Sequence, residues 1–255
     1  MFGFVSLKWF VRIVSIIIFL TGWEIMGLRS GSLLIPTPLA VAQGFITVTV
    51  SGELPVLLGE TLWTFFLGFA IGSLIGVAIG ALMARYGTVE TIIDPYVNAL
   101  YATPYVALVP LFFLWLGIGF QSRVFIVILS VVFVVVINTH AGIRDVNKSL
   151  VEAGRSFGFF GFPLYQKVVL PASLPYIIAA LRLGIARGLI AAIVAQLLVQ
   201  LVGLGYLLEY LAANFFVAEE IAVVLVIALV GLALTESLKF VERRVARWRI
   251  TSSGA

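Results

Sequence analysis

Near the middle of the chain lies a continuous apolar run that decides the fold class, Val131-Val132-Phe133-Val134-Val135-Val136-Ile137. A transmembrane β-strand would alternate apolar and polar residues, so this run excludes a membrane β-barrel. Of the 255 residues, 62% are hydrophobic and only 11% are charged. Soluble domains are typically about half apolar and about a quarter charged. The sequence therefore predicts an all-α integral membrane protein.

Six apolar segments have lengths typical of membrane helices, which need about 20 residues. They span residues 9–28, 61–84, 96–117, 123–139, 173–202 and 219–240. Lys8 and Arg12 before the first segment are also typical of a signal peptide. No small-residue cleavage site follows, so we expect a retained helix. The other residues are too few for a second ordinary domain, which favours a single transmembrane domain over residues 1–255.

Proline and glycine mark the breaks between these segments. A helix cannot continue through Ile35-Pro36-Thr37-Pro38, and the polar stretch that begins at Arg85 ends at Pro95. Gly117-Ile118-Gly119 predicts a tight turn, and Gly203-Leu204-Gly205 predicts the end of the fifth span.

The distribution of Lys and Arg predicts the orientation. With the N-terminus inside, twelve of the sixteen are cytoplasmic: Lys8, Arg12, Arg85, Arg144, Lys148, Arg155, Lys167, Lys239, Arg243, Arg244, Arg247 and Arg249. Only Arg29 and Arg123 fall outside, and Arg182 and Arg187 lie within the fifth span. Because cytoplasmic loops of membrane proteins carry the basic excess, we expect both termini in the cytoplasm. The net charge of +4 is explained in the same way, without nucleic acid as a partner.

The second span carries four glycines, each four residues after the last: Gly68, Gly72, Gly76 and Gly80. This spacing leaves a shallow groove along one helix face, where another backbone can approach closely. We expect helix packing within the bundle. The alternative is a surface on which two helices slide between conformations.

The third span contains Pro104 and Pro110, each of which removes a backbone donor and is expected to bend the helix. Bent helices at membrane depth line protein or a cavity. The polar and aromatic neighbours are therefore candidates for a transport pathway: Asn98, Tyr101, Thr103 and Tyr105. The alternative for Thr103 is a hydrogen bond to its own helix backbone.

Ionisable residues inside a bilayer are costly and indicate function by default. Arg182 and Arg187 are expected near the cytoplasmic end of the fifth helix, where they pair, reach the interface or attract an anion. Glu24 in the first span is a possible partner for one of them. The long apolar segments carry few carboxylates, which argues against a proton-driven carrier.

Motifs of catalysis are missing from the sequence. It has no His-Glu-x-x-His, no Gly-x-Ser-x-Gly and no Gly-x-x-x-x-Gly-Lys phosphate loop. The only histidine, His140, cannot form a metal site alone, and there is no cysteine. We therefore expect no catalysis, no metal and no nucleotide hydrolysis by this chain.

The predicted cytoplasmic loop over residues 149–171 reads as a short amphipathic helix, a glycine-aromatic turn, and a second segment ended by Pro171. It presents apolar side chains on the cytosolic side, Val151, Phe157, Phe159, Phe160 and Phe162. Exposed apolar clusters rimmed by charge indicate a protein contact. The alternative is a helix that lies on the lipid headgroups.

This loop resembles the EAA loop of ABC importer permeases, which reads Glu-Ala-Ala, three residues, Gly, nine residues, Ile-x-Leu-Pro. The matching residues are Glu152-Ala153-Gly154, Gly158 and Val168-Val169-Leu170-Pro171, with the same spacing. Gly154 replaces Ala and Val168 replaces Ile. The resemblance implies that Glu152, Ala153, Gly154, Gly158, Leu170 and Pro171 couple the chain to a separate ATPase subunit.

The resemblance extends over nearly the whole chain and points to the nitrate/sulfonate/taurine branch. It is carried by Ile35-Pro36-Thr37-Pro38, Asp94-Pro95, Pro104 to Pro110-Leu111, Trp115-Leu116-Gly117-Ile118-Gly119, Asn138-Thr139 with Gly142, and Gly203-Leu204-Gly205-Tyr206. Many members carry Ala-Glu late in the fifth span, where this chain has Ala195-Gln196. Gln196 is thus a pathway candidate without the carboxylate.

The resemblance implies a permease subunit of a type I ABC importer in a bacterial-type inner membrane. The implied partners are a second permease chain, identical or different, two cytoplasmic ATPase subunits that hold ATP and Mg, and an extracytoplasmic binding protein. The implied cargo is a sulfonate, nitrate or similar anion, or a vitamin or vitamin precursor such as riboflavin or a thiamine pyrimidine. The alternative is a self-contained channel or secondary carrier. A membrane-bound enzyme has no catalytic constellation to support it.

Overall fold

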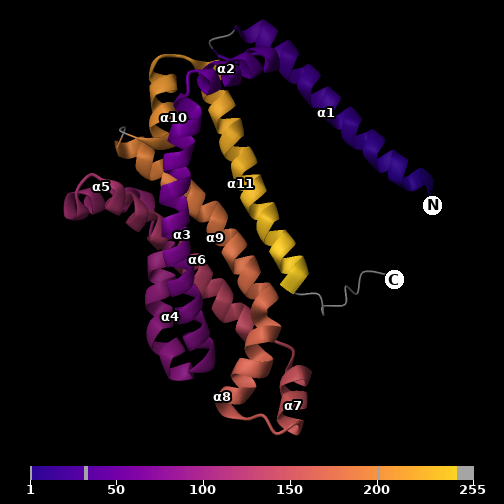
Figure 1. The fold of residues 1–255 in the computed structure, drawn as a ribbon, viewed down its shortest axis with the longest axis vertical. Coiled ribbons are helices and arrows are strands. Elements are labelled where there is room, and N and C mark those ends of the chain that lie inside the picture. The colour runs from indigo at the N-terminus through magenta and orange to yellow at the C-terminus, as the bar shows by residue number, and fades with distance from the viewer. Residues whose placement is uncertain (1, 32–33, 200–201, 246–255) are drawn as a thin grey trace. The chain divides into compact units, whose positions relative to one another are not determined.

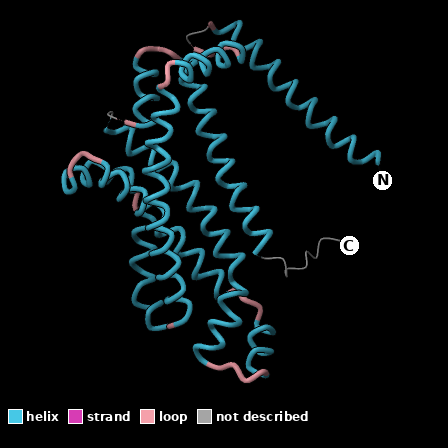
Figure 2. Tube along the Cα trace, viewed as in Figure 1, coloured by secondary structure: helices cyan, strands magenta, loops and turns pink. Residues whose placement is uncertain are grey.

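A computed structural model describes residues 2–31, 34–199 and 202–245, and this part of the chain is helical with no β-strand (Figures 1 and 2). The helices are α1 (Phe2–Ser30), α2 (Pro38–Val50), α3 (Glu53–Arg85), α4 (Gly87–Ala102), α5 (Tyr105–Leu116), α6 (Phe120–Arg144), α7 (Lys148–Ser156), α8 (Gly161–Leu164), the π-helical turn η1 (Tyr165–Val169), α9 (Leu170–Val199), α10 (Gly203–Ala213) and α11 (Val217–Val245). The predicted all-α fold class is confirmed.

Among the described residues, five helices are long and apolar enough to cross a membrane, and the number is six if a bent pair counts as one span. The five are Trp9–Ser30, Glu53–Arg85, Phe120–Arg144, Gly161–Leu198 and Val217–Arg244. The bent pair is α4 and α5, whose axes differ by 97°. The number of spans agrees with the six predicted.

The third span differs most from its prediction. Instead of one bent helix over residues 96–117, α4 begins at Gly87 and the chain breaks at Thr103, before Pro104. The residue before a proline is disfavoured in the α region, and Thr103 has an extended ψ of 130°. Pro95 and Pro110 lie inside helices and end neither of them.

Two further differences concern the ends of spans. Gly203 begins the short helix α10 with a φ of +78°, and α9 ends at Val199. Residues 200–201, at the predicted end of the fifth span, and the predicted cytoplasmic cations Arg247 and Arg249 lie outside the described residues. Pro38 begins α2, because Thr37 serves as its N-cap and accepts a hydrogen bond from the Ala40 N–H (3.3 Å).

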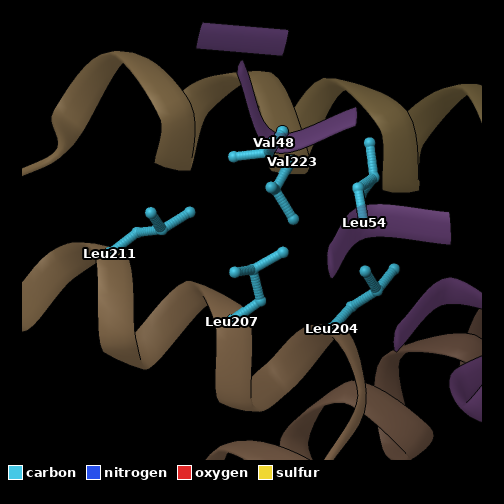
Figure 3. Close-up of a cluster of buried hydrophobic side chains, with 6 residues drawn as sticks. All are labelled: Val48, Leu54, Leu204, Leu207, Leu211 and Val223. Atoms are coloured by element: carbon cyan, nitrogen blue, oxygen red, sulfur yellow. The ribbon is translucent and has the colours of Figure 1, made fainter. Parts of the chain in front are cut away.

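The chain divides into two compact units, and each is considered by itself. The first comprises residues 1–60 and 200–228. Its core is a cluster of six buried side chains that point toward one another (Figure 3), Val48, Leu54, Leu204, Leu207, Leu211 and Val223. The prediction of a single domain over residues 1–255 stays a prediction.

The second unit comprises residues 61–199 and 229–255, and α6 is its central helix. The glycines of α3 contact α6 directly: a Cβ at Gly68 would lie 2.6 Å from the Val127 Cβ, and one at Gly80 would lie 2.7 Å from the Val136 carbonyl oxygen. On α9, a Cβ at Gly188 would lie 2.9 Å from the Val131 Cγ2. Because lipid tails are as apolar as the side chains, such close packing holds membrane helices together by van der Waals contact.

Candidate functional site

A cavity of about 410 Å³ opens in the second unit where α4 and α5 bend away from each other. Its lining is mainly apolar and aromatic and comes from α4, α5, α6 and α9. The lining residues are Leu100, Tyr101, Thr103, Tyr105, Leu108, Leu111, Phe112, Trp115, Phe125, Leu129, Ser130, Phe133 and Arg187. Its volume falls in the range of small-molecule sites.

Arg187 supplies the only formal charge among these lining residues. Its guanidinium carbon lies 6.0 Å from the centroid of the Tyr101 ring, and the Ser130 hydroxyl donates to its carbonyl oxygen (3.1 Å). None of the ion pairs within 4.0 Å in the described part of the chain includes Arg187. Within the described ranges, the cavity therefore contains a cation that forms no ion pair with a carboxylate.

The position of Arg187 corrects the sequence prediction. We expected it near the cytoplasmic end of the fifth helix, but α9 begins at Leu170, seventeen residues earlier. At about 1.5 Å per residue, Arg187 lies roughly 26 Å along the helix from Leu170. An arginine in the middle of an apolar helix is costly in a bilayer, which makes Arg187 a candidate for a functional role.

Of the residues predicted in the third span, Tyr101, Thr103 and Tyr105 line the cavity and Asn98 does not. The Asn98 side-chain amide donates to the Asp94 carbonyl oxygen of its own helix (3.0 Å). The Thr103 hydroxyl also bonds within its helix, to the Ala99 carbonyl oxygen (2.9 Å). Thr103 therefore makes the backbone hydrogen bond of the alternative and also lines the cavity, and its place in a transport pathway stays a prediction.

Arg182 and Gln196 lie apart from the cavity lining. Arg182 forms an ion pair with Glu242 of α11, which is the carboxylate that the sequence analysis missed when it suggested Glu24. Gln196 is fully buried and accepts a hydrogen bond from the Thr61 hydroxyl (2.9 Å). The structure thus places Gln196 in the packing of α9 against α3.

Aromatic residues of α5 and α6 were not predicted to line this cavity. The Phe112 ring packs edge-on against the Phe125 ring, with centroids 5.3 Å apart. The centroids of the Phe112 and Trp115 rings are 6.1 Å apart. The sequence feature that could have predicted this lining is the i, i+3 spacing of Phe112 and Trp115, which places both side chains on one helix face. Among the described residues, no group of three or more acidic or histidine side chains could hold a metal ion.

The predicted coupling loop forms α7, whose N-cap is Asn147. The Asn147 side-chain oxygen accepts from the Ser149 N–H (2.9 Å). Glu152 lies in the middle of α7 and is exposed. With Lys148, Arg155 and Arg85, it lines a cavity of about 440 Å³ at this end of the second unit.

Gly158 ends α7 in a Schellman motif. The Gly158 N–H donates to the Arg155 carbonyl oxygen (2.9 Å), and the Phe159 N–H donates to the Gly154 carbonyl oxygen (3.1 Å). Gly158 has a φ of +82°, and no atom lies within 4 Å of where its Cβ would be. Glycine is therefore favoured by the left-handed conformation and not by close approach.

Gly154, which departs from the family pattern, contacts the segment after the turn. A Cβ there would lie 2.8 Å from the Leu164 Cδ1 and 2.9 Å from the Val168 Cγ2. The helix that follows continues through Leu170 and Pro171 into α9, so the prediction that Pro171 ends the segment is wrong. The π-helical turn η1 shifts the hydrogen bonding before Pro171, since the Leu170 N–H donates to the Tyr165 carbonyl oxygen.

Around α7, large apolar side chains are exposed, with Phe157 at 81%, Phe160 at 64% and Phe162 at 60%. Val151 and Phe159 are partly buried, and the Lys167 ammonium lies 5.1 Å from the Phe159 ring centroid. Of the five apolar residues predicted to be exposed here, three are therefore exposed, and all three are phenylalanines.

A family model described as "Binding-protein-dependent transport system inner membrane component" matches residues 72–250. The permease protein SsuC of Escherichia coli (strain K12), named for aliphatic sulfonates transport, is 34% identical over 84% of this chain and 82% of its own. The formylaminopyrimidine transport permease protein ThiX of Halalkalibacterium halodurans is 27% identical over 89% of this chain and 91% of its own.

The solved structures agree on the fold. A chain of the MetNI methionine ABC transporter, determined in inward facing conformations, has a TM-score of 0.59 with 18% identity. The match covers 74% of this chain and 93% of that chain. The resemblance seen in the sequence is confirmed: this chain belongs to the binding-protein-dependent transport system inner membrane components, as a permease subunit of an ABC importer of the inner membrane.

Proposed function

We propose that this chain moves a small organic sulfonate inward by alternating access, driven by ATP hydrolysis on a separate ATPase subunit. Two permease chains would enclose the pathway, and an extracytoplasmic binding protein would deliver the sulfonate. Both termini would be cytoplasmic. The observation that carries the proposal is the unneutralised Arg187 in a cavity whose other lining residues are neutral and mostly apolar.

The chemistry of the lining matches a sulfonate in two respects. The Arg187 guanidinium offers a planar set of N–H donors and a fixed positive charge, which suits an oxyanion. The aromatic wall of Phe112, Trp115 and Phe125 suits the apolar tail of an alkyl or aryl sulfonate. The relative named for aliphatic sulfonates supports the same class. A neutral pyrimidine, such as the cargo named for ThiX, would give Arg187 no charge to bind.

A self-contained secondary carrier is the weaker candidate. No carboxylate lies among the residues that line the cavity, so the cavity offers no proton relay. The exposed phenylalanines around α7 are instead suited to a docking contact with the ATPase.

The test compares uptake by Arg187→Gln and wild type in proteoliposomes that contain the permease, its ATPase and its binding protein. A hydrogen-bonded charge pair contributes about 1.5–3 kcal/mol, so KM for radiolabelled ethanesulfonate is expected to rise roughly tenfold or more. Arg187→Lys, which keeps the charge but not the planar donors, should fall between the two.

Arg182→Gln is the matched control, because it removes an arginine of the same helix that lies outside the cavity. It should leave KM close to that of wild type. An unchanged KM in Arg187→Gln would contradict the role of Arg187. Uptake of formylaminopyrimidine with no uptake of any sulfonate would contradict the substrate class.

A further inference from the structure

Arg85, the last residue of α3, lies among three aromatic rings. Its guanidinium carbon is 5.1 Å from the Tyr86 ring centroid, 5.5 Å from that of Phe162 and 5.1 Å from that of Tyr165. We call these four residues the Arg85 cluster. None of the ion pairs within 4.0 Å in the described ranges includes Arg85, so its polar contacts are with rings and not with a carboxylate.

Two members of the Arg85 cluster belong to the segment that follows α7. Phe162 lies in α8 and Tyr165 begins η1. The Tyr165 hydroxyl also donates to the Ala81 carbonyl oxygen (3.0 Å), one helical turn before Arg85. This segment is therefore attached to the last two turns of α3 both by ring contacts and by a hydrogen bond.

The other side of the same segment contacts α7. Leu164 and Val168 lie against Gly154, since an added Cβ there would lie 2.8 Å from the Leu164 Cδ1 and 2.9 Å from the Val168 Cγ2. Because Leu164 precedes Tyr165 directly, α7 and the end of α3 contact adjacent residues of one helical segment. A displacement of α7 would thus be transmitted to α3 through Leu164 and then through Tyr165 and the rest of the Arg85 cluster.

From α3 the contact continues to α6 through the glycine face. A Cβ at Gly76 would lie 2.9 Å from the Val132 carbonyl oxygen, so α3 and α6 approach with almost no side chain between them. Helices packed in this way move together because neither can slide without a clash of rigid atoms.

We infer that Arg85 is a positioning residue for coupling: it ties the segment after α7 to α3, so that movement of α7 also moves α3 and α6. This inference rests on the proposed function, in which α7 docks on the ATPase. It assigns to Arg85 neither contact with the ATPase nor contact with the cargo.

The test uses the assembled complex and three substitutions. Arg85→Gln removes the charge, Arg85→Lys keeps the charge but loses the planar group, and Tyr165→Phe keeps the ring but loses the hydrogen bond to Ala81. Arg144→Gln is the matched control, because Arg144 lines the same cytoplasmic cavity but pairs with Glu90. The readouts are recovery of the ATPase, ATP hydrolysis and uptake per ATP hydrolysed.

In Arg85→Gln, we expect the ATPase to remain bound and to hydrolyse ATP, while uptake per ATP falls roughly tenfold. Arg85→Lys and Tyr165→Phe should show smaller losses, and Arg144→Gln should keep the wild-type ratio. An unchanged ratio in Arg85→Gln overturns the inference. Loss of the ATPase from this variant also overturns it, because Arg85 would then serve docking. If Arg85→Gln does not accumulate, Arg85→Lys and Tyr165→Phe decide by the same criteria.

A second measurement needs no transported substrate, so it separates this inference from the proposed cargo. The sequence has no cysteine, so Leu82→Cys and Ser156→Cys allow two spin labels, one on α3 and one on α7. In the otherwise wild-type complex, the distance between the labels should stay constant when ATP and vanadate are added. In Arg85→Gln it should change. A constant distance in both contradicts the inference even if sulfonate uptake is confirmed.

Discussion

Adding one methyl group to the glycine face of α3 should destabilise the protein, and the same change elsewhere on α3 should not. At Gly76, a Cβ would lie 2.8 Å from the Val135 Cβ and 2.9 Å from the Val132 carbonyl oxygen. Carbon atoms in contact prefer about 3.5–4.0 Å, so Gly76→Ala would force the helices apart by roughly 0.7–1.2 Å. Neither neighbouring atom is at the end of a flexible side chain, and overpacking of this kind costs about 1–3 kcal/mol.

Gly59→Ala is the matched control on the same helix. Nothing lies within 4 Å of a Cβ at Gly59, so alanine adds only its helix propensity, about 0.5–1 kcal/mol. Gly76→Ala receives the same propensity gain, and the difference between the two variants therefore isolates the clash. At about 2–4 °C per kcal/mol for a chain of this size, the melting temperatures should differ by roughly 2–12 °C.

The assay is thermal unfolding of each purified variant in detergent, followed by size-exclusion chromatography with fluorescence detection. Gly76→Leu should lower the melting temperature further and reduce the amount of assembled complex, because four heavy atoms must then be accommodated. If Gly76→Ala and Gly59→Ala melt at the same temperature, the close packing of α3 on α6 does not stabilise the protein, and the reasoning from the glycine spacing is wrong.

Three other predictions concern orientation, coupling and the Arg182 ion pair. Reporter fusions after Leu34 should read outside and fusions after Arg155 should read inside; an outside signal at Arg155 would overturn the predicted topology. Membrane vesicles with Gly158→Asp should lose uptake, because a carboxylate is unfavourable beside the negative end of the helix dipole at the C-terminus of α7. Vesicles with Gly158→Asn, a residue of the same size without the charge, should retain more uptake. Equal uptake by the two variants would show that the charge has no effect. Each of the single variants Arg182→Glu and Glu242→Arg should have a lower melting temperature than wild type, and the double variant should recover part of the loss. A double-mutant cycle should give a coupling energy of about 1 kcal/mol. Strictly additive effects of the two substitutions would contradict the ion pair.

The long apolar helices were predictable because their length and composition are set by the membrane and not by distant contacts. The glycine face of α3 was also readable, since a four-residue spacing places residues on one side of a helix whatever lies opposite. The partner helix could not be predicted: nothing in Gly68-x-x-x-Gly72 indicates that α6 fills the groove.

Local sequence signals that are compatible with two structures did not determine the structure of this chain. Pro104 and Pro110 look alike in sequence, yet the chain breaks only before Pro104, where Thr103 takes an extended conformation. Gly203 follows the end of α9, as predicted, but it also begins α10, because a glycine with positive φ can stand at either end of a helix. Arg187 was placed at a helix end on the assumption that arginine reaches for water, and only the bend between α4 and α5 shows a cavity for it in mid-helix.

The arrangement of valines on α6 against glycines on α3 and α9 restricts how relatives of this chain can diverge. The nearest atoms to an added Cβ are backbone and Cβ atoms at Gly72, and at Gly76 they are the Val135 Cβ and Cγ1 and the Val132 carbonyl oxygen, so rotation of a side chain makes little room for a larger residue. Size can change only in pairs: a residue that gains volume at position 76 requires one that loses volume at position 135. Among aligned homologues, positions 72 and 131, and positions 76 and 135, should therefore covary in volume, while Gly59 should vary freely.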